Sequence, residues 1–113
     1  MKVVVDASVF TREEGAFGNI SGSIDVSFEP HVGDSISFVP TDEGSELPPE
    51  FSGLVRVENR VITAGGDKHG LMLSLADITV PTVEDAQALM AFFEDAHGLF
   101  ANIFDEDDEP RSA

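Results

Sequence analysis

The sequence contains no cysteine, tryptophan or tyrosine, and only 6 of its 113 residues are lysine or arginine. The absence of cysteine excludes a disulfide scaffold, a thiolate metal site and a cysteine nucleophile. The scarcity of basic residues argues against direct binding of nucleic acid, which depends on neutralising phosphates. No apolar run approaches the roughly 18 residues that a helix needs to cross a bilayer, so we expect no membrane span.

Acidic residues dominate what is present. The chain has 22 aspartates and glutamates, which gives a formal net charge of −16. A surface of this sign attracts basic partners and steers their encounter with it, although adaptation to high salt would produce the same composition. The apolar stretch at the N-terminus stops at Asp6, too early for the core of a secretory signal. We therefore expect a first strand there and a cytoplasmic protein.

Apolar and polar residues alternate over much of the first 80 positions, as they do in half-buried strands. Strands are expected over residues 2–10, 19–29, 35–39, 51–64 and 70–80. In the last of these the apolar residues change parity near Ala76-Asp77, which predicts a β-bulge.

The period changes after Pro81. Apolar residues then recur at helical spacing from Ala86 to Ala96, with Thr82 placed as the N-cap and Gly98 as the left-handed residue that ends the helix. Strands first and a helix last favour the α+β class. We predict a five-stranded, mainly antiparallel sheet curled into a small open β-barrel, with one C-terminal α-helix over an end or a face.

This organisation predicts one compact domain over residues 1–98, an apolar segment over 99–104 and an acidic, disordered tail over 105–113. The alternation and the helical stripe also predict the core. Its expected members are Val3, Val5, Ile24, Val26, Phe28, Ile36, Phe38, Val55, Val57, Leu73, Leu75, Leu89 and Phe93.

Residues for catalysis or metal binding form no motif. His31, His69 and His97 are dispersed over two turns and a helix end, without HxxxH or HExxH spacing, and we expect three surface imidazoles. A G-x-S-x-G elbow, a P-loop and a G-x-G-x-x-G fingerprint are all missing. The acidic run near the C-terminus lacks the EF-hand pattern. We therefore expect no metal, no cofactor and no enzymatic activity.

Two arginines lie close together in the fourth predicted strand. Regular alternation would place Arg56, Glu58 and Arg60 on one face and Val57 and Val61 on the other. One interpretation is a cross-strand charge ladder in which acids neutralise both arginines. The other is an anion site for a phosphate or for a partner's carboxylate, built from Arg56 and Arg60.

The C-terminal segment has the composition of a short docking motif. Phe100, Ile103 and Phe104 directly precede Asp105-Glu106-Asp107-Asp108-Glu109. These eight residues are the candidate surface for a protein partner. The alternative is that the apolar residues fold back onto the sheet or the helix. Phe92 falls off the main helical stripe and could support a homodimer.

The second half of the chain resembles the closing strands and helix of PilZ-type small β-barrels. The resemblance covers residues 32–97 and is carried by Val32-Gly33-Asp34-Ser35-Ile36, Phe51-Ser52-Gly53-Leu54-Val55-Arg56-Val57 and Gly70-Leu71-Met72-Leu73-Ser74-Leu75. Family members that bind cyclic dinucleotides use R-x-x-x-R before the barrel and D/N-x-S-x-x-G on a following strand. Here the arginine pair comes later, and Asp25-Val26-Ser27 is followed by Pro30 in place of the glycine. The resemblance implies a degenerate member that acts through protein contacts.

Three functional hypotheses follow. The first is a non-catalytic, acidic interaction or regulatory module that binds a basic protein. The second is an acidic inhibitor of a nucleic-acid-binding protein, either a DNA mimic or an immunity-type protein. The third is a degenerate PilZ-like sensor of a small anion or nucleotide, centred on Arg56 and Arg60.

Overall fold

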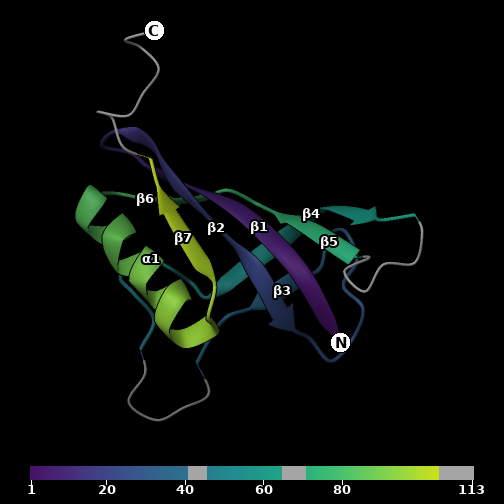
Figure 1. Ribbon diagram of the computed structural model, residues 1–113. Helices are drawn as coiled ribbons and strands as arrows, with labels where there is room; N and C mark the ends of the chain where they lie inside the picture. The colour runs from purple at the N-terminus through teal and green to yellow at the C-terminus, as the bar shows by residue number, and fades with distance from the viewer. Residues whose placement is uncertain (41–45, 65–70, 105–113) are drawn as a thin grey trace, which may run out of the picture.

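The computed structural model describes residues 1–40, 46–64 and 71–104, which form one helix and a mixed sheet (Figure 1). This confirms the α+β class. The elements in chain order are β1 (Lys2–Thr11), β2 (Gly15–Asp25), β3 (Ser35–Ser37), β4 (Leu54–Ile62), β5 (Leu71–Leu75), β6 (Ile78–Val80), α1 (Val83–His97) and β7 (Phe100–Ile103).

The sheet differs from the predicted five-stranded barrel. Within the described residues it has seven strands in the order β3-β4-β5-β1-β2-β7, with β6 also paired to β1, and it is not closed. Strands β5 and β6 run parallel to β1, whereas the other neighbours are antiparallel. Strands β3 and β7 therefore form the two edges.

Strand β1 is central because its alternation gives it one fully apolar face. Val3, Val5, Ala7 and Val9 are all buried. Helix α1 packs beside this part of the sheet and contacts β1, β2, β6 and β7 (Figure 1). No helix in the described ranges is long and apolar enough to span a membrane.

The predicted irregularity near Ala76-Asp77 is confirmed. Val5 lies opposite Leu73, whereas Val9 lies opposite Ile78, so four steps along β1 correspond to five steps along the partner chain. This extra residue divides the predicted strand into β5 and β6. It also lets the apolar residues of both strands reach the buried face despite their different parity.

The helix begins and ends where the sequence predicts. The Thr82 Oγ1 accepts a hydrogen bond of 3.1 Å from the backbone N–H of Asp85. Gly98 has a φ of 66° and its N–H donates to the carbonyl of Glu94. A left-handed residue at this place favours glycine, because it has no Cβ to clash with the backbone.

All but three of the predicted core residues are buried. Ile24 and Val26 are half-buried, and Phe28 is 84% exposed. The second strand was expected to reach residue 29, but it ends at Asp25, which lies opposite Lys2 at the start of β1. In the sequence, the alternation of apolar and polar residues continues to residue 29, but β1 offers no partner beyond Lys2. The alternation therefore predicts that Phe28 is buried, and this prediction is wrong.

The segment expected to follow the compact domain contributes to the sheet. Phe100–Ile103 is β7, which pairs antiparallel with β2, and Leu99 is buried just before it. The alternative prediction, that these apolar residues fold back onto the sheet, is therefore confirmed for Phe100–Ile103. The predicted tail, residues 105–113, lies outside the described residues.

Candidate functional site

Strand β7 ends the sheet and carries exposed apolar side chains. Its hydrogen-bonded neighbour is β2, no other strand of the described residues pairs with its second edge, and α1 lies alongside it (Figure 1). Phe100 is 75% exposed, and Ile103 and Phe104 are each 50% exposed. The structure thus brings the three predicted apolar residues of the docking segment to one edge. Asp105 to Glu109, the acidic half of that segment, are outside the described residues.

Gly18 of β2 positions this edge. A Cβ added to Gly18 would lie 2.2 Å from the carbonyl oxygen of Asn102 and 2.8 Å from Cε of Met90. Only glycine therefore lets β7 approach β2 while α1 packs against both. The start of β7 is fixed by the tight end of the helix, where the N–H of Leu99 donates to the carbonyl of Phe93 at 3.1 Å.

A β-bulge separates the two arginines of the proposed anion site. The register of β4 against β5 shifts between Val57 and Asn59, so Glu58 is an extra residue on β4. One extra residue reverses the face that every following side chain takes. The prediction that Arg56, Glu58 and Arg60 share a face is therefore wrong.

The exposure of these side chains agrees with the reversal. Arg60 lies opposite the buried Leu73 and its side chain is 20% exposed, whereas the side chain of Arg56 is 63% exposed. Arg56 pairs with Glu58 at 2.5 Å. Val61, expected on the inner face, is 45% exposed. The structure does not bring the two guanidinium groups together.

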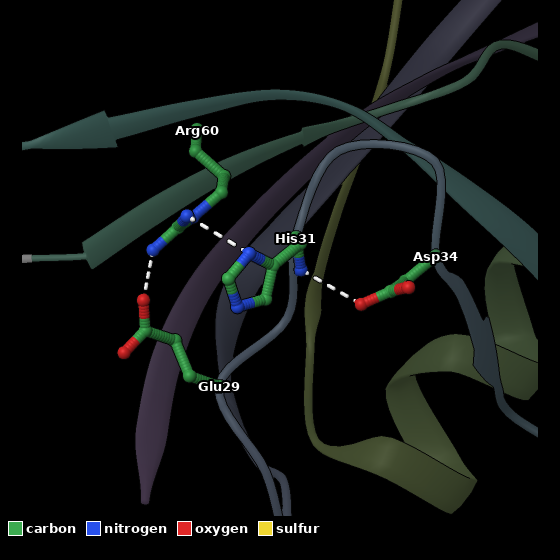
Figure 2. A network of polar contacts seen from close by, with 4 residues as sticks. All are labelled: Glu29, His31, Asp34 and Arg60. Carbon is green, nitrogen blue, oxygen red and sulfur yellow. Dashed lines mark hydrogen bonds and ion pairs between the residues drawn. The ribbon is translucent and has the colours of Figure 1, made fainter.

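Arg60 instead fastens the chain between β2 and β3 onto β4 (Figure 2). Its Nη2 donates to the carboxylate of Glu29, and its Nη1 lies 3.4 Å from Nδ1 of His31. The backbone N–H of His31 donates to Asp34 at 2.8 Å, which closes the turn. Within the described chain, the buried Nε of Arg60 has no hydrogen-bond partner. The charge of Arg60 thus faces a carboxylate of the same chain.

The two histidines that the structure describes, His31 and His97, contact different groups. His97 was expected on the surface but is half-buried, because its Nε2 lies 2.8 Å from the carbonyl oxygen of Phe38 and its ring meets Phe38 and Phe92 edge-on. His31 is exposed, and His69 lies outside the described residues. Over the ranges that the structure describes, no three histidine, aspartate or glutamate side chains are grouped so that they could hold a metal ion.

Acidic residues line two hollows on the surface of the described residues. One, of about 340 Å³, lies between residues 46–48 and α1, and Glu46, Asp95 and Phe92 contribute to it. The other, of about 520 Å³, lies between the end of β2 and β3, where Asp25 and Glu29 contribute. Their described linings include no lysine, arginine or histidine. These walls suit basic groups better than anions.

Comparisons with models of protein families, with curated proteins and with solved structures found no match to this chain. The functional argument therefore starts from the geometry of β7 and from the charge.

Proposed function

We propose that the chain is a non-catalytic, acidic interaction module that binds a basic protein through β7 and the acidic run after it. One observation carries this proposal: three exposed apolar side chains lie at a sheet edge, and five consecutive acids follow them in the sequence. Apolar groups gathered at a surface are typical of interaction sites.

The composition of β7 supports the proposal. Sheet edges that must stay free usually carry a charged residue, a proline or a bulge that prevents further pairing. The sequence of β7, Phe100-Ala101-Asn102-Ile103, contains neither a charge nor a proline, and its register against β2 is regular. This edge is thus suited to contact with another chain.

The net charge of −16 selects the kind of partner. Two acidic surfaces repel each other, and a basic surface gains Coulomb attraction at long range. We therefore expect a partner with a positive binding surface, captured more rapidly at low salt than at high salt.

The test is affinity capture from a cell lysate by the full chain at low salt. We expect captured proteins of high isoelectric point that salt elutes. Replacing the five acids at 105–109 by their amides, or replacing Phe100 and Phe104 by serine, should reduce capture. Ile62→Ser is the matched control, because Ile62 is 70% exposed but lies outside β7 and outside both hollows. Equal capture by all four proteins would contradict the proposal.

Two additions to this experiment separate the alternatives. If duplex DNA displaces the captured protein, the acidic-inhibitor hypothesis is favoured over a general interaction module. A titration with cyclic dinucleotide tests the PilZ-like sensor, which requires shifted amide signals around Arg56 and Arg60. Unshifted signals at millimolar ligand would favour the interaction module.

A further inference from the structure

The hydrogen bonds between β7 and β2 reveal which backbone groups of β7 point outward. The N–H of Phe104 donates to the carbonyl of Phe17 at 2.8 Å, in line with the register that pairs Ile103 with Gly18. In an antiparallel pair, residues alternate between those bonded to the neighbouring strand and those whose N–H and C=O point away. Because the backbone of Phe104 is bonded to β2, the backbone N–H and C=O of Ile103 point away from β2.

The same alternation continues along β7. Asn102 and Phe100 direct their backbone groups to β2, as Phe104 does, and Ala101 directs its groups outward with Ile103. The edge therefore offers two N–H and two C=O groups to a further strand. An added strand satisfies such groups by main-chain hydrogen bonds.

We infer that β7 binds a partner by strand addition, in which an extended basic segment hydrogen-bonds to Ala101 and Ile103. This inference rests on the proposed function and specifies how its partner is held. Phe100 is 75% exposed on the face opposite the buried Ile20, so it can contact alternate side chains of the added strand. The main chain supplies affinity, and alternate side chains supply specificity.

Charge decides between the two candidate occupants of this edge. Pairing of β7 with β7 of a second copy would join two chains that each carry −16. A segment with basic residues meets attraction from the same charge, including the acids that follow Phe104 in the sequence. The occupant we propose is therefore an extended segment of a basic protein and not a second copy.

Amide hydrogen exchange measured by NMR on the full chain tests this mode directly. The probe is a short peptide of alternating lysine and valine with blocked ends, and the control is the same peptide with glutamate in place of lysine. We expect the lysine peptide to slow exchange at Ala101 and Ile103 by at least about tenfold. Exchange at Asn102 and Phe104, already bonded to β2, should change little, and the glutamate peptide should have no effect.

A variant pair isolates the outward N–H. Ile103→Pro removes it and keeps an apolar side chain, while the bonds of Asn102 and Phe104 to β2 are retained. Ile103→Val keeps the N–H and serves as the matched control. We expect the proline variant to bind the lysine peptide at least about tenfold more weakly than the valine variant does. Unchanged protection of Asn102 and Phe104 would verify that β7 still pairs with β2.

Three other outcomes of these experiments would contradict the inference, and one of them would also contradict the proposed function. If the lysine peptide shifts the signals of β7 and of residues 105–109 but leaves Ala101 and Ile103 exchanging freely, strand addition is wrong and the proposed function stands. If the lysine peptide does not bind at millimolar concentration, both are wrong. If protection of Ala101 and Ile103 rises with protein concentration without peptide, the occupant is a second copy and the inference is wrong.

Discussion

Replacing Phe93 by alanine should remove a large part of the stability of this fold. Phe93 is fully buried, and its ring meets Phe38 at 5.1 Å and Phe51 and Phe92 at 5.5 Å. Truncation of a buried phenylalanine costs about 3–5 kcal/mol, and with three aromatic neighbours we expect this site to lie near the middle of that range. A loss of about 4 kcal/mol compares with a total of about 5–15 kcal/mol for a domain.

Urea unfolding followed by far-UV circular dichroism measures this loss, because the chain has no tryptophan or tyrosine to report by fluorescence. With a slope of about 2 kcal/mol per molar urea, the midpoint should fall by about 2 M. Phe28→Ala is the matched control: Phe28 is 84% exposed, so its truncation should change the free energy of unfolding by less than about 0.5 kcal/mol. Equal shifts in the two variants would refute the assignment of the core.

Four further results are expected. Gly18→Ala should lower the free energy of unfolding by about 1–3 kcal/mol and speed amide exchange in β7, since its Cβ would lie 2.2 Å from the Asn102 carbonyl oxygen. Thr82→Ala should cost about 1 kcal/mol in urea unfolding, whereas Thr82→Ser should retain most of the cap. Glu29→Gln should cost about 1–2 kcal/mol because Arg60 is largely buried, against less than about 0.5 kcal/mol for Asp25→Asn in the exposed pair with Lys2. Raising salt from about 0.1 to about 1 M should raise Tm, because the Debye length falls from about 10 to about 3 Å and screens the self-repulsion of a chain at −16; a fall would contradict this.

Local sequence patterns predict an element well where residues close in sequence determine its conformation. Thr82 and Gly98 act within a single turn of backbone, so the sequence around them contains the whole explanation. The parity change near Ala76-Asp77 was visible because apolar residues on both sides had to reach the same core. These features needed no knowledge of distant pairing.

The bulge at Glu58 could not be predicted in the same way. Residues 55–61 alternate best without a bulge, with Val55, Val57 and Val61 on one face. The observed shift depends on how β5 and the turn near His31 contact β4. The sequence around Glu58 contains no local signal for that contact. Regular alternation consequently places Arg60 on the wrong face, although the charge-ladder interpretation includes an acid that neutralises it, and Glu29 is that acid.

The sequence leaves two alternatives for residues 100–104: a segment that docks on a partner, or one that folds back onto the sheet or the helix. The apolar residues were visible, but whether they dock on another chain or return to the sheet depends on space beside β2. That space exists because position 18 has no side chain, and Gly18 lies more than 80 residues before Asn102, with which it is in close contact. Pairing over such separations leaves little trace in either segment alone.

The position of β1 also bears on how the chain matures. Its antiparallel neighbour follows within a short turn, but Leu73, which lies opposite Val5 on the other side, is made much later. As the polypeptide leaves the ribosome, the hairpin of β1 and β2 therefore forms before β5 and β6, and one edge of the apolar strand β1 stays unpaired until they are made. Closing so wide a loop is entropically costly and slow, and acquisition of the native state should be limited by arrival of the segment from Leu71 to Val80.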